Sequence, residues 1–406
     1  MKIQLVPNEL SAKIKVIGVG GAGGNAINDM IASQMAGVDF MAANTDAQAL
    51  ERSLASVKIQ LGPTATRGLG AGGDPEMGRN ATMEESERLK QVIQGADMVF
   101  IAAGMGGGTG TGGAPVIAEV SRDLGALTVA VVSKPFEFEG KMKKRLAETG
   151  IESLRKVVDT IITIPNDQLF KLSSKNSRIK DVFAMANEVL GFAVRGISDL
   201  IMVPGFVNLD FADVRTIMRE RGMALMGTGI SGGANRACEA AQKAISSPLL
   251  EDISISGARG ILINITSSPD ISMEELKEIC GIIQEEADEE AIIKWGLVYD
   301  EGLNEEIRVT VIATGLGKRP EAARVLWSPP AATTQAEIDD LDIPTILRKA
   351  SEIPAAATAA AGGLRQPERR PAPNLGVVAA KKYIVHPDLA YEENELDTPP
   401  FLRRAD

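Results

Sequence analysis

Short, almost continuously apolar runs alternate with amphipathic stretches over the first 165 residues. Five of the apolar runs have the length and β-branched content of single strands: 13–19, 39–44, 97–103, 127–133 and 159–165. Strands that are apolar at nearly every position are typical of a parallel sheet that is covered on both faces. Because stretches with helical character lie between them, the pattern predicts a doubly wound, Rossmann-like α/β domain over residues 1–177.

A long amphipathic segment follows at 178–202. Its apolar residues recur at steps of three and four, and Pro204 and Gly205 come directly after it. Twenty-five residues with this period would form a helix about 37 Å long, and the proline and glycine would end it. The pattern predicts a connecting helix between two domains. The same periodicity, taken alone, places Phe183 in the core.

A second, smaller unit is expected from 203 to 317. Strands are expected at 260–267, 292–300 and 307–315, with a helix at 272–290 between the first two, which indicates an α+β domain. Residues 318–395 have a different composition, and 353–380 alone contain nine alanines and four prolines. That composition predicts a disordered linker, which leads to a short, better-patterned peptide at 396–406.

Composition narrows the classes of function. The 406 residues include 43 basic and 54 acidic side chains, and a net charge of −11 argues against a nucleic-acid partner. Two cysteines and the single His386, which lies in the tail, argue against a disulfide framework, a His/Cys metal cluster or a histidine-based triad in the folded part. No apolar run approaches the ~20 residues of a membrane span, so we expect a cytoplasmic protein without direct membrane insertion.

Two glycine-rich runs each separate an expected strand from an expected helix. Glycine loop 1, "GVGGAGGN" at 18–25, satisfies the pattern G-x-G-x-x-G, and Asp39 or Asp46 lies near the distance of a ribose-binding acid. This loop alone favours a dinucleotide oxidoreductase, with a glycine-lined turn that binds nothing as the alternative.

Glycine loop 2, "GMGGGTGTGG" at 104–113, changes that interpretation. Two helix N-termini with free N–H groups can hold one polyphosphate from both sides, and glycine lets the phosphate approach the backbone. A P-loop would also need a lysine before the final Ser or Thr, and this run contains none. The pair of loops therefore predicts a nucleoside triphosphate held by backbone groups.

The motif "GGGTGTG" (106–112) resembles the signature of the tubulin/FtsZ GTPase family. "VIGVGGAGGNAINDM", "AANTDAQAL", "GLGAGGDPEMGRNA", "KPFEFEG", "TIPND" and "NLDFADVRTIM" extend the resemblance over residues 13–317. It implies a GTPase that binds GTP and GDP, assembles head to tail into filaments and forms the cell-division ring at mid-cell. A scaffold member of the same superfamily that does not hydrolyse nucleotide is the remaining alternative.

The resemblance also implies the residues that contact the nucleotide. Those implied for the phosphates are Gly21, Ala22, Gly23, Gly24, Asn25, Ala71, Gly72, Gly73, Gly108, Thr109 and Gly110. Asn44 follows at a strand's carboxyl end, where open α/β sheets bind ligands. Those implied for the base and ribose are Glu139, Lys143, Asn166, Phe183 and Asn187. Lys143 stands where the family usually carries arginine, and an ammonium does not reproduce a planar guanidinium fork.

Catalytic side chains are expected outside the glycine loops. Locally, Asp210 and Asp213 indicate a helix cap and a first-turn acid. The resemblance implies that Asn208, Asp210 and Asp213 enter the nucleotide pocket of the next subunit and position the attacking water. It also implies Mg²⁺, bound through phosphate oxygens and water.

The end of the chain, "LDTPPFLRRA" at 396–405, resembles the family's docking peptide for membrane anchors and division regulators. A similar segment, "LDIPTILRKA", lies upstream at 341–350. Chance duplication and a second docking site for the same anchor remain equal alternatives for that upstream copy.

Overall fold

The computed structural model describes residues 12–172, 178–203, 205–219, 222–248, 255 and 257–316. The predictions for the linker, for His386 and for the segments 341–350 and 396–406 lie outside the described residues. The strands are β1 (Ile14–Val19), β2 (Val38–Asn44), β3 (Val57–Gln60), β4 (Met98–Gly104), β5 (Leu127–Lys134), β6 (Thr160–Pro165), β7 (Gly222–Ser231), β8 (Gly260–Ser267), β9 (Ile292–Tyr299) and β10 (Ile307–Leu316). The helices are α1 (Gly20–Ala32), α2 (Ala47–Glu51), α3 (Pro63–Thr66), α4 (Pro75–Glu84), α5 (Ser86–Ile93), α6 (Thr109–Asp123), α7 (Lys141–Arg155), α8 (Asn166–Leu172), α9 (Ile179–Met202), α10 (Phe211–Met218), α11 (Arg236–Ile245) and α12 (Met273–Glu286).

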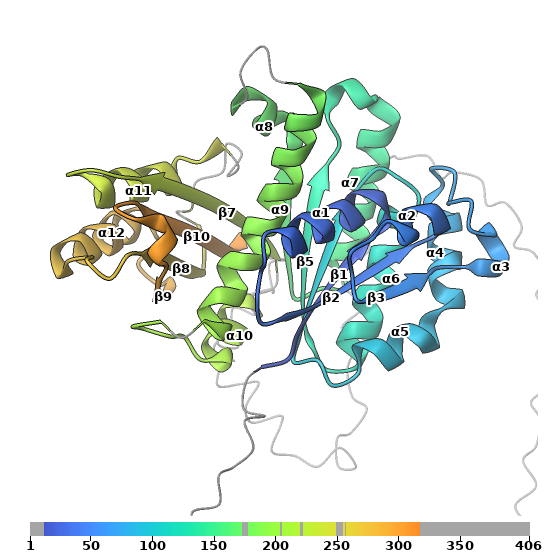
Figure 1. Cartoon of the computed structure of the whole chain (residues 1–406), viewed down its shortest axis with the longest axis horizontal. Coiled ribbons are helices and arrows are strands. Elements are labelled where there is room, and N and C mark those ends of the chain that lie inside the picture. The colour runs from blue at the N-terminus through green and yellow to red at the C-terminus, as the bar shows by residue number, and fades with distance from the viewer. Residues whose placement is uncertain are drawn as a thin grey trace, which may run out of the picture. The chain divides into compact units, whose positions relative to one another are not determined.

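All of these strands join one sheet in the order β3-β2-β1-β4-β5-β6-β7-β10-β8-β9 (Figure 1). The strands β1 to β6 pair in parallel, whereas β10 runs antiparallel to both β7 and β8. The chain order reverses between β1 and β4, and open α/β sheets bind ligands at the carboxyl ends of the strands beside such a reversal. The fold therefore indicates a binding site where β1 and β4 end.

Both faces of the parallel half are covered, as the apolar runs predicted. Along β1, Ile14 and Val16 pack into a core with α1 and α9, while Ile17 and Val19 pack into a second core on the opposite face with α5, α6 and α7. A third core lies under α11 and α12. The predicted mixed α/β architecture with a long connecting helix is confirmed.

Helix α9 begins at Ile179 and ends at Met202, within one residue of its predicted start. It packs against α1, and the side-chain amide of Asn264 on β8 donates a hydrogen bond of 3.1 Å to the carbonyl of Gly196. The helix is thereby attached both to the glycine-loop half of the sheet and to the later strands.

Strand β7 was not predicted, and its glycines explain why. A Cβ atom at Gly227 or Gly229 would overlap a carbonyl oxygen of α11, at Ala244 or Ala240. Close packing of a helix on this strand requires glycine, and glycine removes the β-branched signal by which strands are recognised. Since β7 pairs with β6 at Thr160–Ile162, the two expected domains share one continuous sheet.

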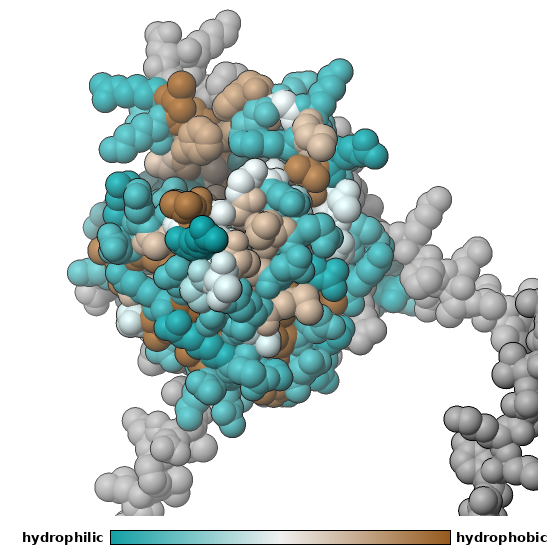
Figure 2. Space-filling view, turned by 90° about the vertical axis from the view of Figure 1, so that its right-hand side faces the viewer, coloured by the Kyte–Doolittle hydropathy of each residue, from teal (hydrophilic) through white to brown (hydrophobic). Residues whose placement is uncertain are grey.

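Hydrophilic residues predominate on the face shown in Figure 2, and the hydrophobic ones are scattered among them. Among the described helices, none has both the length and the apolarity required to cross a membrane.

Candidate functional site

Glycine loop 1 is mostly the beginning of α1 rather than a loop before it. The helix starts at Gly20, directly after β1, and Gly20 has a positive φ of 74°. A Cβ at Gly18 or Gly23 would overlap backbone of α1 or β4, whereas at Gly21 and Gly24 it would meet nothing within 4 Å. The run thus combines two glycines for close helix packing with two that leave open space at the helix N-terminus, where an anion can approach.

Glycine loop 2 divides in the same way. Gly106 has a φ of 98°, Gly107 faces open space, and α6 begins at Thr109. Inside α6, a Cβ at Gly112 would overlap the carbonyl of Pro75, where α4 packs on α6. The sequence interpretation attributed the whole run to phosphate binding, but the structure shows that part of it serves helix packing.

The two loops meet at a cavity of about 260 Å³, which we call the nucleotide cavity. A second cavity, also about 260 Å³, adjoins it at Gly20 and Gly21. The predicted residues that line the nucleotide cavity are Gly21, Ala22, Gly108, Thr109, Gly110, Glu139, Lys143, Asn166, Phe183 and Asn187. Those that line the adjoining cavity are Gly21, Gly24, Asn25 and Asn44. The hydroxyls of Thr45 and Thr109 lie 2.6 Å apart and connect the end of β2 to glycine loop 2.

Three side chains form the end of the nucleotide cavity away from the glycine loops. Phe183 is 42% exposed and contacts Phe136 edge to face, so the periodicity that placed it in the core was wrong. Asn166 is 6% exposed, and its side-chain oxygen has no hydrogen-bond partner in the described part of the chain. Because a buried acceptor without a partner is costly, this oxygen indicates a place for a ligand donor. Asn187 lies one helical turn after Phe183.

Glu139 and Lys143 pair with each other at the rim. The ammonium of Lys143 lies 3.0 Å from one carboxylate oxygen of Glu139, and the other oxygen accepts the N–H of Phe136 at 2.9 Å. The carbonyl of Lys143 also lies where a Cβ at Gly106 would point. Lys143 is therefore held at the cavity by its backbone and by Glu139.

Four of the predicted phosphate residues line neither cavity. Gly23 lies inside α1 and packs against Ala102 of β4. Ala71, Gly72 and Gly73 form a turn in which both glycines have positive φ and open space beside them, and the Cβ of Ala71 lies 2.8 Å from a Cβ built at Gly108. The turn therefore lies next to glycine loop 2 but outside the cavity.

Ser133 and Pro135 also line the nucleotide cavity, lie outside both glycine loops and were missed by the sequence analysis. They stand at the end of β5. The signal that identifies them is the rule that ligands bind beyond the carboxyl ends of parallel strands, applied to each strand in turn.

The aspartate segment (208–213) lies away from the nucleotide cavity. The Asp210 carboxylate accepts the N–H of Asp213 at 2.7 Å and caps α10, as the local pattern predicted, and Asn208 accepts the N–H of Gly205 at 2.7 Å. Asn187 and the end of α9 at Met202 are fifteen residues apart, or about 22 Å along the helix. The aspartate segment follows that far end, and α10 and α8 lie at opposite ends of α9 (Figure 1).

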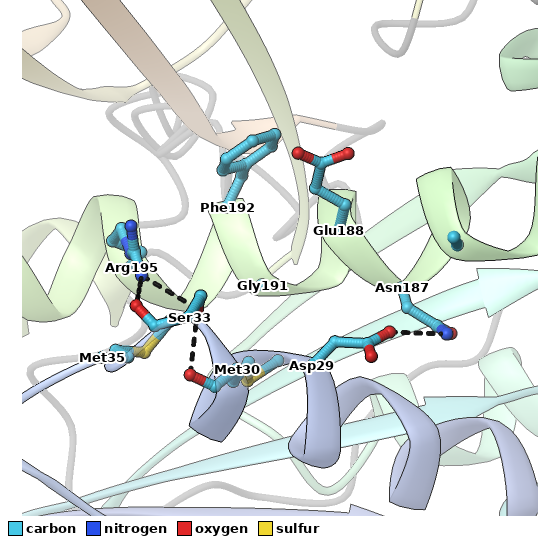
Figure 3. A pocket seen from close by; sticks show the side chains of 10 residues that line it. Asp29, Met30, Ser33, Met35, Asn187, Glu188, Gly191, Phe192 and Arg195 are labelled. Carbon is cyan, nitrogen blue, oxygen red and sulfur yellow. Dashed lines mark hydrogen bonds between the residues drawn. The ribbon is translucent and has the colours of Figure 1, made fainter. Parts of the chain in front are cut away.

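A larger cavity, of about 380 Å³, lies between α1 and α9 beside the nucleotide cavity. Its walls include Met30, Phe192 and Arg195, and Asn187 belongs to both cavities (Figure 3). We call it the interhelix cavity.

Glycine-rich helix N-termini at the reversal point of a parallel sheet, with a buried acceptor and an aromatic ring at the other end, define a nucleotide-binding α/β protein. Residues 13–174 match the model of the Tubulin/FtsZ family, GTPase domain, and residues 222–317 match that of the FtsZ family, C-terminal domain. The chain therefore belongs to the tubulin/FtsZ family of GTPases, and within it to the FtsZ cell-division proteins.

Individual relatives agree with this assignment. The cell division protein FtsZ of Pseudomonas aeruginosa is 48% identical over 407 residues, which cover 97% of each chain. That of Buchnera aphidicola is 55% identical over 313 residues, which cover 77% of this chain and 82% of the relative. The solved FtsZ dimer of M. jannaschii is 45% identical and has a TM-score of 0.73, over 76% of this chain and 89% of that one. The dinucleotide oxidoreductase suggested by glycine loop 1 is therefore excluded.

Proposed function

We propose that this GTPase binds GTP in the nucleotide cavity and hydrolyses it only when the aspartate segment of a second subunit reaches that cavity. The observation that carries the proposal is the separation of the two parts: the cavity and the aspartate segment lie at opposite ends of α9. A rigid helix of this length keeps Asp210 and Asp213 from the nucleotide of their own chain. Two subunits that meet in the same orientation bring the aspartate segment of one to the nucleotide cavity of the other.

Within the cavity, the phosphates lie at the N-termini of α1 and α6, where Gly21 and Gly107 leave open space. The base lies at the other end, against the ring of Phe183, with the unpartnered oxygen of Asn166 accepting a hydrogen bond from the nucleotide. Asn25, Asn44 and the turn at 71–73 lie on the phosphate side, and Glu139 and Lys143 at the ribose side. Mg²⁺, held by phosphate oxygens and water, supplies charge compensation when it is bound.

Asn208, Asp210 and Asp213 act in this scheme on the neighbour's terminal phosphate. Their oxygens orient a water molecule for in-line attack, which is the contribution that phosphoryl transfer requires from a protein. Each interface then uses the cavity of one subunit and the aspartate segment of the next. Such a head-to-tail contact does not close on itself and yields an open filament. The M. jannaschii relative, solved as a dimer, supports self-association within the family.

A mixing experiment tests the shared site. Gly21→Val places a side chain into open space at the phosphate end, so it should abolish GTP binding without straining the fold. Asp213→Ala should keep GTP binding and lose hydrolysis. Each variant alone should release almost no phosphate, whereas an equimolar mixture should regain activity, because the intact aspartates of Gly21→Val can act on GTP bound by Asp213→Ala. An inactive mixture, or an active Asp213→Ala alone, contradicts the shared site.

We further propose that the filament forms the division ring in the cytoplasm at mid-cell and is held at the membrane through residues 396–406. In that peptide, Asp397 and Thr398 suit a helix cap, Phe401 and Leu402 suit an apolar groove, and two arginines follow. The upstream copy at 341–350 retains the Leu, Asp, Pro and Arg positions but has Ile346 in place of Phe401. It therefore docks more weakly at the same anchor and adds avidity.

Calorimetry of peptides 338–352 and 393–406 against the membrane anchor tests the two-site arrangement. Heat from both peptides, with mutual competition and weaker binding of 338–352, is the expected result. Absence of heat and of competition from 338–352, at concentrations where 393–406 saturates, identifies the upstream copy as a chance duplication.

A further inference from the structure

A single hydrogen bond forms part of the wall between the nucleotide cavity and the interhelix cavity. The side-chain nitrogen of Asn187 on α9 donates to a carboxylate oxygen of Asp29 on α1 at 3.0 Å (Figure 3). Asp29 lines only the interhelix cavity, whereas Asn187 lines both. Asp29 therefore touches a residue of the nucleotide cavity from behind, without lining that cavity itself.

The chemistry of this pair fixes the orientation of the amide. An ionised carboxylate can only accept hydrogen bonds, so the NH₂ group of Asn187 must face Asp29. The amide oxygen is then turned away from Asp29, and no described residue donates to it. An amide without such a partner can rotate and exchange its donor and acceptor, which present nearly the same shape.

A second contact fixes the spacing of the two helices. At the other end of the interhelix cavity, the guanidinium of Arg195 on α9 donates to the carbonyl and the hydroxyl of Ser33, at 3.1 and 3.0 Å, just after α1 (Figure 3). These contacts and the Asp29–Asn187 bond join α1 to α9 at both ends of the cavity. The position of Asp29 relative to Asn187 is therefore set by the helix packing, before any ligand binds.

We propose that Asp29 is a positioning residue for base recognition: it holds the oxygen of Asn187 toward the bound base and so makes the site select guanine. The inference rests on the proposed position of the base. Guanine presents two donors on one edge, its ring N1–H and its 2-amino group, and both suit a fixed acceptor. Xanthine carries a carbonyl oxygen in place of the 2-amino group, which the same acceptor repels. Hypoxanthine, the base of ITP, has only a hydrogen in place of the 2-amino group.

The first test is nucleotide binding to the full chain below the concentration at which it assembles, by displacement of a fluorescent GTP analogue. Asp29→Ala should weaken GTP by about three- to tenfold, the value of one hydrogen bond, and should raise the affinity ratio of XTP to GTP. The GTP preference over ITP should fall as well. Glu188→Gln is the matched control, because Glu188 lines the same cavity and carries the same charge, but in the described part of the chain its side chain makes no hydrogen bond to that of Asn187. It should leave all three affinities unchanged.

An exchange of the two side chains supplies a sharper test. In Asp29→Asn combined with Asn187→Asp, the residue at 187 can only accept, and the amide at 29 can donate to it. The double variant should regain the wild-type GTP to XTP ratio that Asp29→Ala loses, and a ratio that stays at the Asp29→Ala value would contradict the inference. Unfolding temperatures without nucleotide verify that each variant is folded.

The outcomes separate this inference from the proposed function. If Asn187→Ala weakens GTP but Asp29→Ala leaves both the GTP affinity and the XTP to GTP ratio unchanged, the role of Asp29 is contradicted and the position of the base stands. If Asn187→Ala itself has no effect, the position of the base at Asn187 is wrong and the inference fails with it.

Discussion

The ammonium of Lys294 on β9 lies 2.9 Å from a carboxylate oxygen of Asp213 in the first turn of α10. Both side chains are partly exposed, at 40% and 34%. The aspartate proposed to act on a neighbouring nucleotide is thus already paired with a cation, at the end of α9 remote from its own nucleotide cavity. An exposed ion pair contributes little to stability, so a functional effect of Lys294 can be separated from a structural one.

Removal of this charge should slow hydrolysis. Lys294→Met keeps much of the side-chain length but leaves Asp213 unpaired and removes a positive charge that would lie near the neighbour's terminal phosphate. We expect the GTP turnover per chain, measured as phosphate release well above the assembly threshold, to fall about three- to tenfold while GTP affinity stays constant. Lys277→Met, on the exposed part of α12, is the control. A higher GTP turnover of Lys294→Met would contradict this prediction and would mean that the ion pair restrains Asp213.

Substitutions at the two kinds of glycine in glycine loop 2 should differ in their effect on the free energy of unfolding. Alanine at Gly112 would overlap the carbonyl of Pro75 and crowd the nitrogen of Arg79, so Gly112→Ala should lower the free energy of unfolding by about 1–3 kcal/mol. Gly107→Ala enters open space and should change it by less than about 0.5 kcal/mol. Urea unfolding without nucleotide measures both variants. Equal losses would contradict the assignment of Gly112 to helix packing.

Asp199 on α9 should make stability depend on pH. Burial raises the pKa of its carboxyl to about 6, against the opposing effect of Arg195 and Arg308, with a further increase from Asp300. Because the folded state holds this proton more tightly than the unfolded state, the stabilisation is complete below about pH 4 and is lost as pH rises through 6. Asp199→Asn should therefore be more stable than the wild type by about 1–2 kcal/mol at pH 8. The two unfolding free energies should converge toward pH 4, and a constant difference would contradict the buried carboxyl.

The sequence predicted those parts of the fold that depend on burial along one element. Both faces of the sheet are covered, so β1, β4, β5 and β6 are apolar at most positions, and α9 keeps its period for 24 residues. Strand β7 was not predicted because its contact with α11 requires glycines. Strand β3 was not predicted because four residues are too few to show a hydrophobic pattern. The first failure comes from tertiary packing, which no local window contains, and the second from the shortness of the strand.

The site was predicted unevenly for the same reason. The phosphate end follows from glycines beside two strands, and the resemblance added Asn166, Phe183 and Asn187. Periodicity placed Phe183 in the core because it counts an aromatic residue as apolar, whichever cavity the residue lines. The contact of Asp29 with Asn187 joins residues 158 positions apart, and neither belongs to a motif that links them. Only the packing of α1 on α9 reveals it.

The most direct measurement of the central claim is the rate of GTP hydrolysis per chain as a function of protein concentration, followed by phosphate release at saturating GTP. Because each chain keeps its nucleotide cavity and its aspartate segment at opposite ends of α9, the rate should be near zero at nanomolar concentration. It should rise steeply above a threshold that coincides with the onset of light scattering. A rate per chain that stays constant on dilution would show that one chain carries a complete site and would contradict the account.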